Sequence, residues 1–124
     1  MIYIVINGLA IAVAAFIGLA IALLWYRKRP SPTALITLYF ANLWLAAILA
    51  GALILAPPKG SIWTMTIGSA VIIWAGFVAP AIAGSYQIRR LSFGKIATDA
   101  GYWLVTMVAQ SILMRLIGLT APPA

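Results

Sequence analysis

The sequence predicts an all-α integral membrane protein that folds as an antiparallel bundle of four transmembrane helices. The first observation is composition: 65% of the 124 residues are hydrophobic and 7% are charged, whereas soluble domains carry about 25% charged residues. The second is that apolar stretches of about 18 residues or more, long enough to cross a bilayer, occur four times. We expect a single domain, residues 1–124, with spans at 2–26, 34–56, 62–85 and 96–119.

The first predicted span, 2–26, carries no charged residue. It is too long for the apolar region of a signal peptide, and no Lys or Arg precedes it, so we expect a retained membrane anchor. Trp25 and Tyr26 mark its inner end, as is typical of aromatic residues at a membrane interface. Small residues at helical spacing permit close packing in lipid. Those that predict the packing face here are Gly8, Ala12, Ala15 and Ala22.

The second predicted span, 34–56, follows the proline-containing segment 27–32 and ends before Pro57 and Pro58, because proline cannot continue a helix. Trp44 lies deep within it. We expect this indole to pack in the core or against lipid; the alternatives are contact with another subunit or with a pigment-like ligand. The small residues that predict its packing face are Ala46, Ala47, Ala50 and Gly51.

The third predicted span, 62–85, combines glycine with proline. Proline frees a backbone carbonyl that neighbouring groups must satisfy. Pro80 and Tyr102 have similar predicted depths in adjacent helices, so we expect that they can meet. Trp74 is as deep as Trp44, and the same alternatives apply to it. The small residues expected to pack on a neighbouring helix are Gly68, Gly76, Pro80 and Gly84.

The fourth predicted span, 96–119, carries polar residues at steps of three and four, which places them on one helix face. Unsatisfied polar groups are costly in lipid, so this face should point into the bundle. It would either form hydrogen bonds between helices or line a polar pathway or small pocket. Arg115, near the far end, is expected to extend to the outer membrane surface. The polar stripe is Asp99, Tyr102, Thr106 and Gln110, and its expected partners are Asn7, Asn42, Thr64 and Thr66.

Asp99 is the only acidic residue of the chain and lies near the start of the fourth span. An intramembrane ionisable group is a candidate functional residue. We expect it to form an ion pair with Lys95, Arg89 or Arg90 and so to hold the third and fourth helices together as a hairpin. A role in proton or cation coupling, and contact with a ligand or partner, are the alternatives.

Basic residues predict the orientation. Six of the eight Lys and Arg residues lie in the first and third connections, whereas the second holds only Lys59. The positive-inside rule then places these two connections in the cytoplasm and both termini outside. We expect a prokaryotic inner membrane, and anionic lipids rather than nucleic acid at the two basic clusters. The six residues are Arg27, Lys28, Arg29, Arg89, Arg90 and Lys95.

The composition also limits the chemistry. The chain has no Cys, no His and one carboxylate side chain. These absences exclude disulfides, Cys or His metal sites, Ser-His-Asp and Cys-His catalysis, and mechanisms that need two carboxylates. We therefore expect no enzymatic activity of this chain and no cofactor or metal.

The two halves of the chain are loosely similar. Tyr26 followed by basic residues compares with Tyr86 followed by Arg89 and Arg90. One interpretation is a parallel repeat about an axis along the membrane normal. The other, which we favour, is that any four-span protein that obeys the positive-inside rule shows such a pattern.

Three motifs resemble a family of small bacterial membrane proteins, the domain of unknown function 1761. They are Trp25–Tyr26, the segment WAGFVAP at 74–80 and the segment DAGYWL at 99–104, in the order that the family has. The chain departs after Tyr26, where the family has a small residue, proline and Phe-Gly, and this puts a role of that connection in doubt. The resemblance implies four spans and no particular activity. It implies these signature residues: Trp25, Tyr26, Gly76, Pro80, Asp99, Gly101 and Tyr102.

Three functions remain open on the sequence. The first is a non-catalytic protein that forms a homo-oligomer or serves as an accessory or structural subunit of a membrane complex. The second is a minimal transporter or channel that uses the polar stripe of the fourth span. The third is a protein that binds lipid or another hydrophobic ligand. Small-residue faces and the lack of catalytic residues favour the first.

Overall fold

A computed structural model describes residues 2–27, 30–57 and 60–122, and these residues form helices and no strand. Lys28, Arg29, Pro58 and Lys59, which the sequence interpretation used, lie outside the described residues. The elements are α1 (Ile2–Ile6), α2 (Gly8–Tyr26), α3 (Pro32–Leu55), α4 (Ile62–Ile73), the π-helical turn η1 (Trp74–Val78), α5 (Ala79–Ile88) and α6 (Phe93–Ile117).

Four helical stretches are long and apolar enough to cross a membrane, so the prediction of four spans is confirmed at the level of length and composition. They are 8–26, 32–55, 62–88 and 93–117. Two spans begin earlier than predicted because a serine caps each start: Ser31 Oγ accepts from the Ala34 N–H, and Ser92 Oγ from the Lys95 N–H. Pro32 then occupies the first helical position, where its missing N–H costs nothing.

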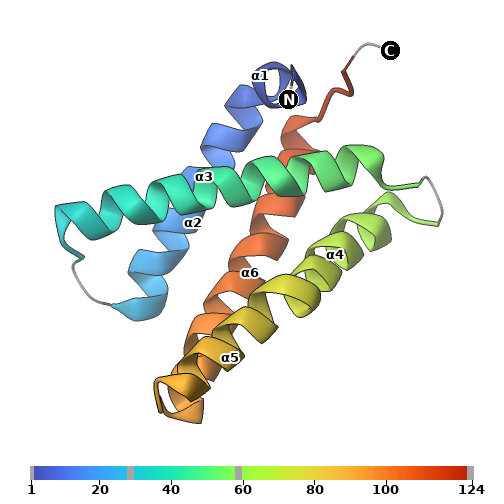
Figure 1. The fold of residues 1–124 in the computed structure, drawn as a ribbon. Coiled ribbons are helices and arrows are strands. Elements are labelled where there is room, and N and C mark those ends of the chain that lie inside the picture. Colours follow the sequence, from blue (N-terminus) through green and yellow to red (C-terminus); the bar gives the residue numbers. More distant parts are fainter. Residues whose placement is uncertain (1, 28–29, 58–59, 123–124) are drawn as a thin grey trace.

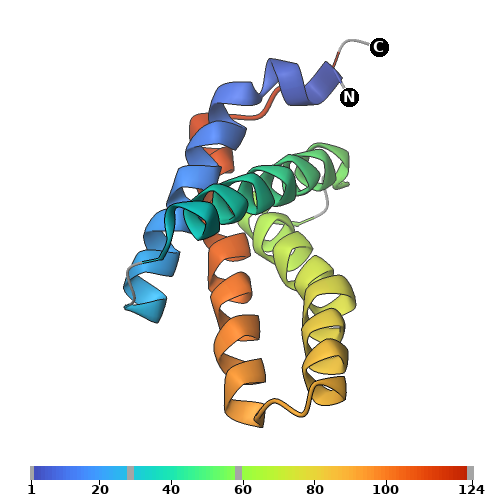
Figure 2. The ribbon, with the colours of Figure 1, turned by 60° about the vertical axis from the view of Figure 1, so that its left-hand side comes forward.

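The first predicted span is not one helix, because the chain turns at Asn7. This residue has φ −103° and ψ 20°, and it separates α1 from α2. Its amide binds the C-terminal segment: Nδ2 donates to the Thr120 carbonyl at 2.8 Å, and Oδ1 accepts from the Thr120 N–H at 2.7 Å. Asn7 was expected to serve the polar stripe of the fourth span; instead it fixes this turn, and α1 points away from the axis of α2 (Figure 2).

The helices do not all run alongside one another. Figure 1 shows α3 crossing α2 and α6, whereas α5 and α6 are joined by a short turn and form a hairpin. The α2 helix packs on both α3 and α6, and α4 packs on α6. Helix α6 therefore contacts every other span, so several of its faces are turned toward neighbouring helices.

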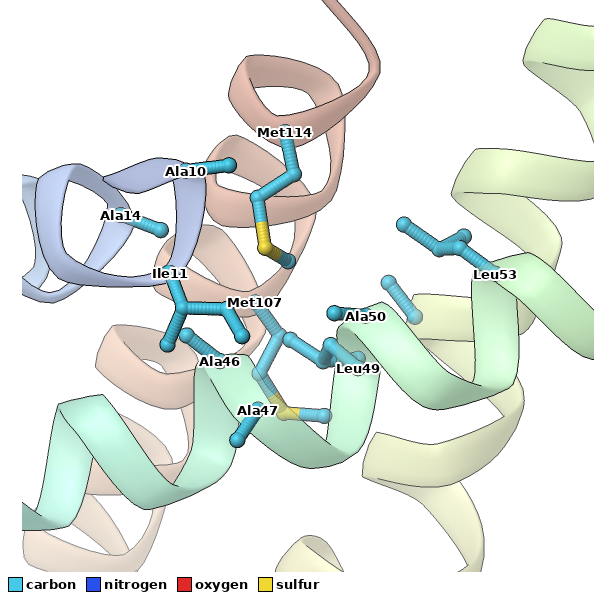
Figure 3. Packing of buried hydrophobic residues seen from close by; sticks show 11 residues of the cluster. Ala10, Ile11, Ala14, Ala46, Ala47, Leu49, Ala50, Leu53, Met107 and Met114 are labelled. Carbon is cyan, nitrogen blue, oxygen red and sulfur yellow. The ribbon is translucent and has the colours of Figure 1, made fainter. Parts of the chain in front are cut away.

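The core is built from small and flexible side chains of α2, α3 and α6 (Figure 3). Ala46, Ala47 and Ala50 are buried, which confirms the packing face predicted for the second span. On α2 the prediction was right for Ala15 and Ala22. It was wrong for Gly8 and Ala12, which are half-buried because they lie beside the buried face. That face is Ala10, Ile11, Ala14, Ala15, Gly18 and Ala22.

The third span contributes little to the core. Only 6% of its most apolar window is buried, against 33–39% for the other spans. Gly76, Pro80 and Gly84 are exposed, so the packing face predicted for this span is not used within the described residues. The helix widens just before Pro80, where the Ala79 N–H donates to the Trp74 carbonyl. Pro80 has no N–H to donate to the carbonyl four residues earlier, and its ring crowds that same carbonyl. This accounts for the π turn.

Candidate functional site

Three residues of the polar stripe lie in the centre of the bundle. Tyr102, Thr106 and Gln110 are at most 1% exposed, so this part of the stripe points inward as its spacing predicts. Asp99, one turn earlier on α6, is half-buried. Thr64, an expected partner, is exposed on α4 and does not take part.

Of the four partners expected from the sequence, Asn42 of α3 is the one that binds the polar stripe. Gln110 Nε2 donates to Asn42 Oδ1 at 2.9 Å and to the Ala14 carbonyl of α2 at 3.1 Å. Asn42 Nδ2 donates to the Leu38 carbonyl at 3.0 Å and to Tyr102 Oη at 3.3 Å. The two amides therefore link α2, α3 and α6 through hydrogen bonds in the buried centre of the bundle.

Tyr102 completes this network through Gly18. Its hydroxyl donates to the Gly18 carbonyl at 2.8 Å. A Cβ at Gly18 would lie 1.9 Å from Asn42 Oδ1, so only glycine leaves room for the amide. Pro80 is exposed and does not meet Tyr102, contrary to the expectation from their depths. The reason is that Tyr102 faces α2 and α3, whereas Pro80 lies on the outer face of α5.

Asp99 forms a second polar cluster, with two tyrosines. Tyr26 Oη donates to Asp99 Oδ1 at 2.6 Å, and Tyr86 Oη donates to Oδ2. The described residues contain no ion pair with Asp99, so the predicted pairing with a basic residue is wrong there. Both carboxylate oxygens are taken by phenols from α2 and α5, while Lys95 and Arg89 are exposed. We call Asp99, Tyr26 and Tyr86 the aspartate cluster.

Two indoles bind the backbone of α6 beside this cluster. Trp25 Nε1 donates to the Thr98 carbonyl at 3.1 Å, and Trp74 Nε1 donates to the Ala100 carbonyl at 2.8 Å. A Cβ at Gly101 would lie 3.2 Å from the Trp25 ring. Of the seven signature residues that the family resemblance implies, all but Gly76 and Pro80 therefore meet at the start of α6.

Three buried oxygens of α6 have no hydrogen-bond partner among the described residues: Thr106 Oγ1, Gln110 Oε1 and Ser111 Oγ. They do not line any of the cavities named here. The residues of this polar core are neutral. In the described ranges, no group of three His, Cys, Asp or Glu residues could hold a metal ion.

An apolar groove of about 670 Å³ lies between α3 and the third span. Its aromatic lining is Trp44, Phe77 and Trp103, and we call it the tryptophan groove. Trp44 is 58% exposed. It is therefore not a core residue, which was one of the positions expected for it from its depth in the span. The groove escaped the sequence interpretation because it depends on how α3 lies relative to the third span. Its one sequence signal was the deep position of Trp44.

Arg115 occupies the opposite end of α6 from Asp99. It was expected to extend to the outer membrane surface; in the structure its half-buried side chain reaches the end of α3 and the first turns of α4. Nε donates to Thr66 Oγ1 at 3.0 Å and Nη2 donates to the Leu53 carbonyl at 2.9 Å. Thr66 is fully buried and was expected to serve the polar stripe; it binds Arg115 instead. These two acceptors hold the guanidinium between α3 and α4.

Comparison of the chain with protein families, curated proteins and solved structures found no match in any of the three. The resemblance to the domain of unknown function 1761 therefore stays a prediction.

Proposed function

We propose that this chain is a membrane protein without catalytic chemistry of its own that works by self-association. The tryptophan groove is the contact between copies. The observation that carries this proposal is the Trp44 indole, which is exposed at the middle of α3. Its N–H has no acceptor in the described part of the chain, whereas the indoles of Trp25 and Trp74 each donate to a carbonyl.

The position of Trp44 is unfavourable for an indole that faces lipid. Tryptophan prefers the membrane interface, where its N–H reaches water or headgroups. At mid-span the surroundings are hydrocarbon, which accepts no hydrogen bond, and an unsatisfied polar group there is costly. A lipid chain in the groove would leave this N–H unsatisfied. A second copy of the chain offers carbonyl and hydroxyl acceptors, and this favours protein over lipid as the occupant.

The third span supports the same contact. It forms one wall of the tryptophan groove through Phe77, and its glycines face open space: a Cβ at Gly76 or Gly84 would meet nothing within 4 Å. Small residues let helices approach closely in a membrane. The packing face predicted for this span is thus available to another copy rather than used within one chain.

Cysteine cross-linking tests self-association directly, because the chain has no cysteine of its own. Phe77→Cys places a thiol on the groove. Phe16→Cys is the matched control, since both phenylalanines lie near mid-span and are 74% and 61% exposed, but Phe16 does not line the groove. After oxidation in native membranes, we expect a product of twice the monomer mass from Phe77→Cys alone.

The other results contradict self-association at the groove. Equal cross-linking of both variants would indicate random collision. No product from Phe77→Cys, together with a co-purified lipid, would assign the groove to a hydrophobic ligand. A product with a different protein would make the chain an accessory subunit of a heteromeric complex.

The location that we propose is a prokaryotic inner membrane, with the aspartate cluster at the cytoplasmic side. The basic residues Arg27, Arg89, Arg90 and Lys95 lie near this end of the helices and carry the orientation through the positive-inside rule. Anionic lipids are their expected counterpart. Membership of the domain of unknown function 1761 is part of the same proposal, supported by the motifs around Trp25, Trp74 and Asp99.

Transport is a second candidate, and the unpartnered oxygens of Thr106, Gln110 and Ser111 favour it, because they could face a water or cation. Flux of protons and monovalent cations into reconstituted vesicles tests this candidate. Transport predicts a flux above that of empty vesicles that falls in Asp99→Asn. A flux equal to that of empty vesicles would remove it.

A further inference from the structure

Arg115 is a permanent positive charge held at the end of the bundle. A guanidinium stays charged in proteins and carries five N–H donors. Two neutral acceptors, Thr66 Oγ1 and the Leu53 carbonyl, receive Nε–H and one donor of Nη2. The Thr66 hydroxyl itself donates to the Ile62 carbonyl at 2.7 Å, so it serves Arg115 as an acceptor. Three N–H groups of the guanidinium remain for another partner.

The chain supplies no side-chain counter-charge for Arg115. Its one acidic residue, Asp99, lies about 24 Å away along α6 at 1.5 Å per residue. Both oxygens of Asp99 already accept from Tyr26 and Tyr86. A charge at the edge of hydrocarbon is costly unless an opposite charge or several hydrogen bonds compensate it. The remaining compensation for the Arg115 charge must therefore come from an anionic ligand or from a group other than the residues named here.

A cavity of about 260 Å³ lies directly beside Arg115. Its lining includes this charged side chain, whereas the tryptophan groove has no charged side chain in its lining. Its walls come from the end of α3 (Leu53, Ile54), the following residues Ala56 and Pro57, and the start of α4. Helix α4 begins at Ile62, so the positive end of its dipole adds to the charge of Arg115.

We propose that this cavity binds the phosphate group of a phospholipid, with the Arg115 guanidinium as its donor. The planar guanidinium fork matches phosphate geometry. The cavity lies where two spans end or begin, which is the level of lipid headgroups, so a lipid supplies the phosphate while its chains stay in the bilayer. Trp44, Phe77 and Trp103 do not line this cavity, and the proposal is therefore independent of self-association at the tryptophan groove.

Native mass spectrometry tests the site on delipidated full-length protein titrated with phosphatidylglycerol. We expect Arg115→Gln to weaken the tightest lipid-binding step by about tenfold or more, the value of hydrogen bonds to a charged group. Arg89→Gln is the matched control: it removes the same charge from an exposed position at the other end of the bundle. It should weaken only the looser, charge-dependent binding of anionic lipid expected at the basic residues there and leave the tightest step unchanged. Equal weakening by both variants would indicate a net-charge effect and overturn the site.

Met65→Trp provides a second variant that keeps Arg115. Met65 lines the cavity, so the larger side chain should fill it and weaken the same binding step even if Arg115→Gln fails to fold. Wild-type affinity in Met65→Trp would overturn the proposal. Diacylglycerol with the same chains tests the phosphate: equally tight binding would show that the chains alone are recognised. Inorganic phosphate tests the source, since binding as tight as that of the lipid would assign the site to free anions instead.

Discussion

Gln110 and Asn42 face each other across the centre of the bundle, where Gln110 Nε2 donates to Asn42 Oδ1 at 2.9 Å. The two residues are 68 positions apart in the sequence, and both are fully buried. Each amide also binds a backbone carbonyl, that of Ala14 or of Leu38. A shift of α3 against α6 would leave these amides unsatisfied in an apolar region, so the pair specifies how the two helices align.

Replacement of the two amides tests this alignment as a double-mutant cycle. We expect Gln110→Leu and Asn42→Leu each to lower the free energy of unfolding by about 1 kcal/mol, with a coupling of about 0.6 and at most about 1.7 kcal/mol, the range for hydrogen bonds between membrane helices. Unfolding in mixed detergent micelles gives the four values. Strict additivity would contradict a direct interaction between the two side chains.

Gly18 predicts a sharp steric effect. A methyl group there would lie 1.9 Å from Asn42 Oδ1, and the amide could not keep its contact with Gln110. We expect Gly18→Ala to cost about 1–3 kcal/mol of unfolding free energy through overpacking. Gly8→Ala on the same helix is the control, because a Cβ at Gly8 meets nothing within 4 Å. Similar stability of the two variants would contradict the close approach of α2 and α3.

Much of the fold follows from periodicity and composition. Four apolar stretches give four spans, and the steps from Tyr102 to Thr106 to Gln110 give the buried face of α6. Asn42 was identifiable as a partner because an amide in an apolar span needs a hydrogen bond. These inferences succeed because each depends on one helix and on the cost of a polar group in lipid.

The rest depends on how helices are placed in three dimensions. Spacing alone does not show how α3 lies relative to the third span, so it reveals neither the tryptophan groove nor the exposure of Gly76 and Gly84. Ion pairing at Asp99 was a reasonable expectation from neighbouring basic residues. One of its two actual partners, Tyr26, is 73 positions away, and no local pattern indicates such a contact. Likewise, Arg115 found acceptors inside the bundle that only the packing of α3 and α4 provides.

The aspartate cluster predicts coupled losses of stability. Tyr26 and Tyr86 donate to different oxygens of Asp99 and so join α2 and α5 to α6. Hydrogen bonds to a charged acceptor are worth about 1.5–3 kcal/mol, and we expect Tyr26→Phe and Tyr86→Phe each to lower stability toward the lower end of this range because the site is partly exposed. Thermal unfolding in detergent measures both variants.

The same substitutions in an Asp99→Ala background provide the control. Once the carboxylate is absent, removal of either phenol should change the unfolding temperature little. An undiminished loss would mean that the phenols stabilise the helices by ring packing alone, as in the contact of Tyr26 with Tyr102 at 5.5 Å between centroids.

Ser111 and Thr66 are equally buried hydroxyls for which the structure predicts opposite effects. Ser111 Oγ has no partner among the described residues, whereas Thr66 Oγ1 contacts the Ile62 carbonyl and Arg115. Removal of an unpartnered hydroxyl removes a cost, so Ser111→Ala should leave the unfolding free energy unchanged or raise it by up to about 1 kcal/mol. Thr66→Val should lower it by about 1 kcal/mol or more, because it leaves the guanidinium with one acceptor fewer. If Ser111→Ala destabilises the protein as much as Thr66→Val, Ser111 has a partner such as an internal water, and the polar core would then be open enough to favour the transport candidate.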